Sequence, residues 1–170
     1  GFNISLSEIA SVGTLGVIYA AFMVFATFCF ALFVAKALGL SKDSAVLIGS
    51  GASICGAAAV MATQNEIKAD ANKLAIAICT VILFGSIGMF IYPFIAKFLA
   101  LTPHQTGFFI GGSLHEVAHV VAASAAFDGT ASSTALIIKM LRVIMLVPFL
   151  FLLNFLNLSQ NSGGSKLKSI

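Results

Sequence analysis

Charged residues are scarce in this chain of 170 residues: Asp, Glu, Lys and Arg make up 9% of it, whereas 59% of the residues are hydrophobic. A typical soluble domain carries about 25% charged residues, which it needs to cover its surface. The shortage excludes an ordinary soluble enzyme, a nucleic-acid-binding domain and a disordered chain. The few basic residues, with a net charge of +3, are therefore predicted to anchor loops at a membrane surface.

Cysteine is scarce as well, with three residues in the chain. Cys29, Cys55 and Cys79 all lie in apolar runs and show no CxxC spacing, which argues against a disulfide framework and a cysteine-based metal site. We predict free, buried thiols that act as small apolar residues. The chain starts at Gly1 without a basic n-region or a cleavage site, so we expect an excised or processed piece.

Long apolar runs are what the sequence does contain. They extend from Val12 to about Leu38, from Lys73 to Leu101 and from Thr134 to Leu158. Each exceeds the ~20 residues that a helix needs to cross a bilayer. The sequence therefore predicts an all-α polytopic membrane protein, with one transmembrane domain over residues 1–158 and a flexible polar tail over residues 159–170.

Two shorter apolar segments, residues 45–62 and 107–124, lie between these runs, and each carries a Gly/Ser cluster. Glycine weakens a helix by about 1 kcal/mol per residue, and a broken helix in lipid must line a cavity or pack within protein. We predict two broken or re-entrant helices, each followed by a long helix, in an internal repeat. Paired interrupted segments point to the binding site of a transporter.

The distribution of basic residues bears on how these two segments insert. If both are re-entrant, most lysines lie on one side of the membrane, whereas spanning segments divide the basic residues almost evenly. The positive-inside rule therefore favours re-entrant segments, and both arrangements place the C-terminal tail in the cytoplasm.

The glycine clusters are the first candidate site. We expect each to precede a half-helix whose N-terminal N–H groups and positive dipole end bind an anion. A close helix crossing that needs small residues is the alternative. Two cations of the last run are predicted to face inward and balance the anion's charge, rather than to extend toward the interface. The predicted anion site comprises Gly49, Ser50, Gly51, Ser53, Gly111, Gly112, Ser113, Lys139 and Arg142.

Glu116 is the only acidic residue within a segment at membrane depth, and such residues usually have a function. On a helix it would form one polar cluster with His115 and His119. Because histidine titrates near neutrality, we predict that the three residues couple transport to protons or ions. The simpler alternative is a Glu–His pair that only packs two helices.

His115 to His119 also spell HExxH, the motif of zinc metalloproteases. An intramembrane zinc hydrolase is therefore a second hypothesis, although the sequence offers no clear third ligand. A membrane scaffold that transports nothing is a third hypothesis. We favour a protein that is not an enzyme and holds no metal or cofactor.

Three segments resemble the YeiH-type family of bacterial inner-membrane proteins. Residues 48–60 contain that family's SICGAAA sequence, residues 112–123 are similar to its HEVAQVVAA segment, and residues 139–149 are similar to KMLRVMMLAPF. The resemblance extends to about Leu156. It implies a multi-helix sulfate exporter related to cation/proton antiporters and bile-acid symporters, of which this chain is the central part. His119 stands where the family has Gln, so His115 and Glu116 form the more secure pair.

Together these observations predict a secondary transporter that exports a small anion, such as sulfate or a sulfonate, across the bacterial inner membrane. Its expected partners are the small anion, the lipid bilayer and a second copy of the chain in a homo-oligomer. No nucleic acid is expected.

Overall fold

The computed structural model describes the backbone of residues 6–164 and the side chains of residues 13–155. Within this part of the chain, every regular element is an α-helix. The long helices are α1 (Leu6–Ala37), α4 (Ala71–Phe98), and the consecutive pair α7 (Gly129–Ile144) and α8 (Leu146–Gly164). The all-α fold class is confirmed for the described residues.

Among the described residues, three stretches are long and apolar enough to cross a membrane: Gly13–Ala37, Ala71–Phe98 and Gly129–Phe155. They coincide with the three runs predicted from the sequence, except that the third begins earlier. In α1 the span starts at Gly13, where a φ of 57° kinks the helix. The third span bends between α7 and α8, because Pro148 has no N–H to donate to the carbonyl of Ile144.

Four short helices fill the segments between these spans: α2 (Lys42–Ser53), α3 (Ala57–Ile67), α5 (Pro103–Ser113) and α6 (Val117–Ser124). Polar caps determine where the first helix of each pair begins. The Ser41 hydroxyl accepts a hydrogen bond from Ser44 N at the start of α2. Thr102 and Gln105 form a capping box before α5, where Pro103 supplies a favourable first residue.

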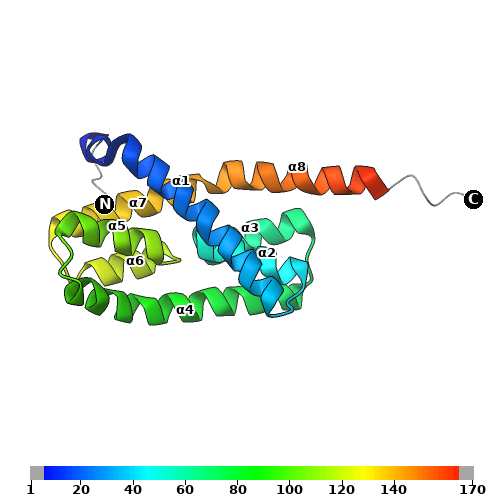
Figure 1. Ribbon diagram of the computed structural model, residues 1–170, viewed down its shortest axis with the longest axis horizontal. Helices are drawn as coiled ribbons and strands as arrows, with labels where there is room; N and C mark the ends of the chain where they lie inside the picture. The colour runs from blue at the N-terminus through cyan, green and yellow to red at the C-terminus, as the bar shows by residue number, and fades with distance from the viewer. Residues whose placement is uncertain (1–5, 165–170) are drawn as a thin grey trace, which may run out of the picture.

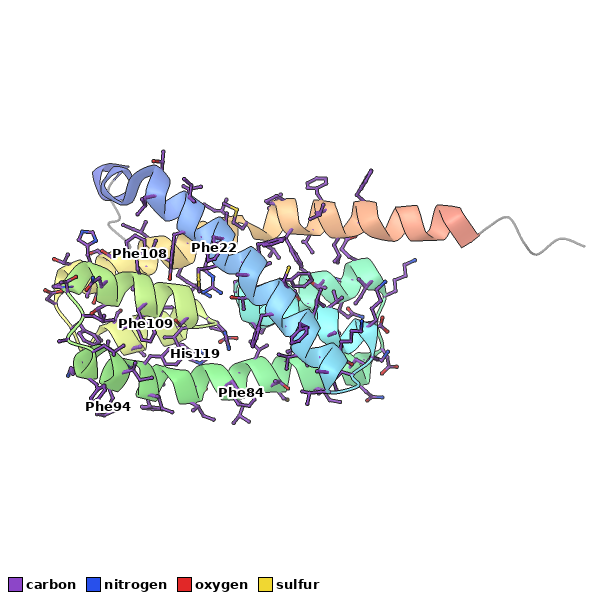
Figure 2. All side chains as sticks on the ribbon, viewed as in Figure 1. Phe22, Phe84, Phe94, Phe108, Phe109 and His119 are labelled. Carbon is purple, nitrogen blue, oxygen red and sulfur yellow. The ribbon has the colours of Figure 1, made fainter. Side chains whose placement is uncertain are left out.

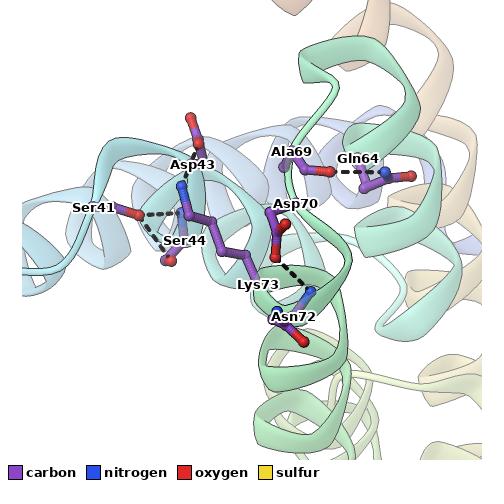
Figure 3. Close-up of polar contacts among 8 residues, drawn as sticks. All are labelled: Ser41, Asp43, Ser44, Gln64, Ala69, Asp70, Asn72 and Lys73. Atoms are coloured by element: carbon purple, nitrogen blue, oxygen red, sulfur yellow. Dashed lines mark hydrogen bonds and ion pairs between the residues drawn. The ribbon is translucent and has the colours of Figure 1, made fainter.

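The α2–α3 pair is a helical hairpin that starts and ends at the same end of the molecule (Figure 1). Lys73, at the start of α4, donates to Asp43 Oδ2 at the start of α2, with a distance of 2.6 Å. Gln64 near the end of α3 bonds the carbonyl of Ala69, 3.0 Å away, just before α4. Figure 3 shows these contacts in one cluster. The polar ends of α2, α3 and α4 therefore lie together.

The α5–α6 pair forms a second hairpin at the opposite end (Figure 1). Lys97, in the last turn of α4, lies over the ring of Phe127, which follows α6, at 5.6 Å from the ring centre. The helix α4 runs alongside both hairpins, α2 packs on α1, and α5 packs on α7. A hairpin followed by a long helix thus occurs twice, and the two hairpins point toward each other.

The outer surface of the long helices is apolar. Figure 2 shows Phe84 and Phe94 directed away from the body of the molecule on α4. Large apolar side chains are exposed along the outer faces of α1, α4 and α8, among them Phe22, Phe25, Phe30, Phe33, Phe84, Phe90, Phe94, Phe151 and Phe155. Such a surface suits lipid or further apolar protein.

The cysteines and the C-terminal segment differ in part from what the sequence suggests. All three cysteines are free, as predicted, but Cys29 and Cys79 are exposed on the apolar surface and Cys55 is only half-buried. The backbone of α8 continues to Gly164, into the segment predicted as a polar tail. Residues 165–170 of that tail, like residues 1–5, lie outside the described part of the chain.

Candidate functional site at the meeting of two helical hairpins

The turns of the two hairpins meet in the interior. Residues 54–56 separate α2 from α3, and residues 114–116 separate α5 from α6. Lys139, on α7, joins both turns: its Nζ donates to the carbonyls of Ile54 at 2.7 Å, Leu114 at 2.9 Å and His115 at 2.5 Å. The ammonium has three N–H donors, and each of them has an acceptor.

Arg142 lies one turn further along α7 and binds the last turns of α2 and α5. Toward α2, Nε donates to Ser53 O at 3.0 Å, and Nη2 donates to Ala52 O at 3.1 Å and to Ser53 O at 2.6 Å. Toward α5, Nη1 donates to the carbonyls of Gly111 and Gly112. The five N–H donors of the guanidinium are therefore used.

Both cations are fully buried, with 0% of their surface exposed. A buried charge is tolerated only when it is paired and hydrogen-bonded. The partners here are carbonyls at the C-terminal ends of α2 and α5, where unpaired C=O groups and the helix dipoles create negative potential. The prediction that Lys139 and Arg142 face inward is confirmed, but backbone carbonyls, not an anion or Glu116, receive their hydrogen bonds.

The glycine clusters lie at the C-terminal ends of helices, whereas the sequence predicted that they would precede helix N-termini. Gly49 to Ser53 form the last turns of α2, and Gly111 to Ser113 end α5. They therefore present carbonyl oxygens to the turns, whereas the expected half-helix N-termini begin after residues 56 and 116. A C-terminal end attracts cations rather than anions.

The side chains of the clusters serve packing in this conformation. Ser50 donates to Leu47 O and Ser53 to Ser50 O, both within α2. Ser113 is half-buried at the end of α5. A Cβ atom at any of the four glycines would press on a neighbouring helix: Gly49 on Phe28, Gly51 on Val60 and Val81, Gly111 on Ala135, and Gly112 on Tyr19. Close helix packing, the alternative reading of the clusters, accounts for these contacts.

The N-termini of α3 and α6 differ from those of their neighbours. A side-chain oxygen of Ser41, Asp70, Thr102 or Asp128 caps each of α2, α4, α5 and α7. No side-chain cap of this kind is present at Gly56 before α3 or at Glu116 before α6. Two helix N-termini that receive no cap from their own cap residue therefore meet in the interior.

Glu116 connects these two N-termini. It is the residue before α6, yet its Oε1 accepts a hydrogen bond from Ala57 N in the first turn of α3, at 3.3 Å. The side chain lies against Gly56, whose φ is +76°. A Cβ at Gly56 would collide with Glu116 Cγ, so glycine is needed there for both the backbone and the space.

The two histidines of the α5–α6 hairpin face α4 at Gly85. His119 Nε2 is 3.3 Å from Ser86 Oγ, and Figure 2 shows the ring between α6 and α4. The Nδ1 atoms of His115 and His119 are buried without a hydrogen-bond partner. Because α6 begins at Val117, His115 lies outside the helix, and the HExxH residues do not share one helical face. The described residues contain no group of three His, Cys, Asp or Glu side chains that could hold a metal ion.

The imidazole of His119 packs directly against Gly85 on α4, in space that a larger residue would fill. A Cβ at Gly85 would lie 2.6 Å from His119 Nδ1 and 2.8 Å from Cε1. Gly85→Ala is therefore expected to displace the imidazole and to lower stability by about 1 kcal/mol or more. In a His119→Ala background the same change should raise stability, because alanine favours a helix over glycine by about 1 kcal/mol. Thermal unfolding of the four proteins measures this reversal of sign; the same sign in both backgrounds would contradict the assignment.

Sequence reasoning did not identify Gly56, Ala57, Gly85 or Ser86 as site residues. One signal for Gly56 was available in the sequence. It directly precedes three alanines, which favour a helix, so it could have been recognised as the residue before a short helix. The contact of Gly85 and Ser86 with His119 joins helices that are distant in sequence, so local pattern gives no sign of it.

Comparison with known proteins places the chain among membrane proteins. All 170 residues match the family model described as conserved hypothetical protein 698. The UPF0324 inner membrane protein YeiH of Escherichia coli strain K12 is 44% identical over 173 residues, which cover 99% of this chain and 50% of that protein. A UPF0324 membrane protein of Campylobacter jejuni is 44% identical over 183 residues, covering 100% of this chain and 50% of the relative.

These comparisons confirm the resemblance and the location predicted from the sequence. The chain spans about half the length of the curated relatives it matches. No solved structure matches it. The names of the relatives state a membrane location and no activity. The chain belongs to the family described as conserved hypothetical protein 698, and it is a multi-pass inner membrane protein.

Proposed function

We propose that this chain forms the core of a secondary transporter that moves a small anion, such as sulfate or a sulfonate, across the inner membrane. The observation that carries the proposal is the meeting of two helix N-termini, α3 and α6, whose own cap residues give no side-chain cap, around the single carboxylate of Glu116. Helix N-termini bind anions through free N–H groups and the positive end of the dipole. An anion would lie beside Gly56, Ala57 and Val117 rather than in the Gly/Ser clusters.

Charge near this position supports the proposal. Lys139 holds the turns of both hairpins, and Arg142 holds the adjoining ends of α2 and α5, so two positive charges are fixed in the interior. Their donors are occupied by carbonyls, so they would act on an anion through the electrostatic field. In a medium of low dielectric constant that field is stronger than in water.

The arrangement of the hairpins supports transport rather than binding alone. They start at opposite ends of the molecule and meet at their turns (Figure 1). A ligand held between the turns could be exposed to either side by movement of one hairpin against the other, the geometry of alternating access. His115 and Glu116, in the α5–α6 turn, would couple that movement to protons or ions.

The first test is anion transport by the complete gene product in proteoliposomes. We expect saturable uptake of radiolabelled sulfate or of methanesulfonate, and binding of the same anion in isothermal titration calorimetry. Ala58→Asp adds a carboxylate to the first turn of α3, where an acidic residue is compatible with the helix. The new negative charge should repel the anion and weaken its binding about tenfold or more, which corresponds to ~1.4 kcal/mol.

Asn65→Asp is the matched control, because it adds the same charge to the last turn of α3 on an exposed residue. It should leave anion binding near the wild-type value. Absence of saturable uptake and binding for sulfate, methanesulfonate and acetate would overturn the proposed function. If both substitutions weakened anion binding equally, the anion would not bind at the first turn of α3.

A further inference from the structure

An apolar groove follows one face of α1. Ala21, Phe25, Phe28 and Leu32 recur every three or four residues, so they line the same side of the helix. The opposite wall is α8, where Phe149 packs edge to face on Phe28 with ring centres 5.0 Å apart. The cavity between the two helices measures about 400 Å³.

A second cavity, also of about 400 Å³, lies between the last turn of α1 and the start of α2. Leu32 lines both cavities, so they follow each other along α1. We call the two together the α1 groove. It extends along α1 from Ala21 to Gly39.

The two parts of the α1 groove differ in chemistry. The part between α1 and α8 is lined only by apolar side chains and the thiol of Cys29. Lys36 and Lys42 line the other part. Asp43, the acidic residue next to Lys42, is paired with Lys73 at 2.6 Å, so its charge is already balanced. The groove therefore combines a long apolar part with two positive charges at one end.

We propose that the α1 groove binds one anionic phospholipid, with its phosphate between Lys36 and Lys42 and an acyl chain along α1 toward Ala21. The length of the apolar part suits a lipid chain. From Leu32 to Ala21 the helix rises about 16 Å, at ~1.5 Å per residue. One leaflet supplies roughly 15 Å of the ~30 Å of hydrocarbon in a bilayer. This inference is independent of the proposed function.

The charge at the polar end of the groove selects the headgroup. Four lysines lie at this end of the molecule (Figure 1): Lys36, Lys42, Lys68 and Lys73. Lys97 lies at the other end of α4. The positive-inside rule therefore assigns the polar end to the cytoplasmic leaflet, where basic pockets between helices bind anionic headgroups. A zwitterionic lipid carries its own cation beside the phosphate, so the two lysines favour an anionic lipid.

Concave shape distinguishes the α1 groove from the rest of the apolar surface. Phe22 and Phe33 project from the outer face of α1 with 64% and 71% of their surface exposed, so they suit any bulk lipid. A transmembrane helix of the complete protein would fit the apolar part of the groove. It would also cover the ammonium groups of Lys36 and Lys42, and a charge within a membrane is costly unless it is paired. A phosphate supplies that pairing.

The test is lipid binding by the complete gene product, measured by native mass spectrometry. Phosphatidylglycerol and phosphatidylcholine with the same acyl chains are titrated separately. The wild type should bind one phosphatidylglycerol with at least tenfold higher affinity than phosphatidylcholine. Lys36→Gln and Lys42→Gln should each weaken phosphatidylglycerol binding about fivefold and leave phosphatidylcholine binding unchanged.

Lys68→Gln is the matched control for charge, because it removes an exposed lysine at the same end of the molecule but outside the groove. It should keep the affinity of the wild type for phosphatidylglycerol. If it weakened binding as much as Lys36→Gln and Lys42→Gln, general surface charge rather than the α1 groove would attract the lipid, and the proposal would be wrong.

The acyl chain is tested by Leu32→Trp, which places a larger side chain where the two cavities join. It should lower the affinity for phosphatidylglycerol at least tenfold. Phe33→Trp is the matched control, since it puts the same residue on the neighbouring, exposed position; its affinity should stay near the wild-type value. A site for free phosphate would be insensitive to both substitutions. Size-exclusion chromatography verifies that each variant is folded.

Three results would overturn the proposal. The first is equal affinity of the wild type for the two lipids. The second is phosphatidylglycerol binding that changes neither in the two lysine variants nor in Leu32→Trp. The third is a wild type that binds neither lipid, which would mean that another part of the complete protein, or a second copy, closes the groove. None of these results bears on anion transport, so the proposed function is tested separately.

Discussion

Arg142→Met is expected to prevent the complete protein from reaching its folded state. Methionine has a similar length but no hydrogen-bond donor, so the carbonyls of Ala52, Ser53, Gly111 and Gly112 would lose their bonds to the guanidinium. Each buried polar group left without a partner costs about 1–3 kcal/mol. Several such groups together approach the whole stability of a domain, which is about 5–15 kcal/mol.

The loss would also be electrostatic, because Arg142 faces the negative ends of two helix dipoles at once. Arg142→Lys keeps the charge but has three donors instead of five. It should therefore fold, with a clearly lower midpoint of thermal unfolding. Fluorescence-detected size-exclusion chromatography, before and after heating, measures both the folded yield and the midpoint.

Lys97→Met serves as the control, since it removes an exposed cation from the end of α4 that lies only over the ring of Phe127. We expect its folded yield and unfolding midpoint to stay close to those of the wild type. If Arg142→Met showed the same small effect as Lys97→Met, Arg142 would not hold the two hairpins together.

The long spans could be predicted because length and apolar composition suffice. The runs that start at Val12 and Lys73 correspond to the spans Gly13–Ala37 and Ala71–Phe98. The predicted start of the third span, Thr134, lies too late, because that span begins at Gly129. The small polar residues of Gly129 to Ser133 look like a loop by hydropathy, whereas Asp128 accepts from Ala131 N and begins the helix before them. A cap is a stronger signal there than hydropathy.

The polarity of the half-helices could not be read from composition. Glycine and serine weaken a helix wherever they lie, so a Gly/Ser cluster shows that a helix is interrupted but not which helix it belongs to. The clusters belong to α2 and α5 and therefore expose carbonyl oxygens to the turns. For the same reason the partners of Lys139 could not be foreseen, because a backbone carbonyl acceptor leaves no trace in the sequence.

Gly111→Leu is expected to have an effect of similar size, through packing instead of charge. A Cβ at Gly111 would lie 3.1 Å from both Cα and C of Ala135 and would collide with its carbonyl oxygen. These are backbone atoms of α7, so rotation of a side chain cannot relieve the clash. Leucine should abolish folding, and Gly111→Ala should lower the free energy of unfolding by about 1–3 kcal/mol.

Displacement at Ala135 would reach the hairpin turns, because Lys139 lies one helical turn further along α7. Gly111→Ala should therefore weaken anion binding as well as stability. The matched control is Gly129→Ala at the start of α7, where a new Cβ meets nothing within 4 Å; its unfolding midpoint should be unchanged or slightly higher.

Because the clash at Gly111 involves backbone atoms of Ala135, shortening the Ala135 side chain should not relieve it. Ala135→Gly removes no atom that Gly111→Ala would strike, so the double variant should be no more stable than the sum of the two single changes predicts. The clash at Gly85 is the opposite case, since removing the His119 ring should relieve it. Rescue of Gly111→Ala by Ala135→Gly, in thermal unfolding of all four proteins, would show that side chains rather than backbones set the distance between α5 and α7.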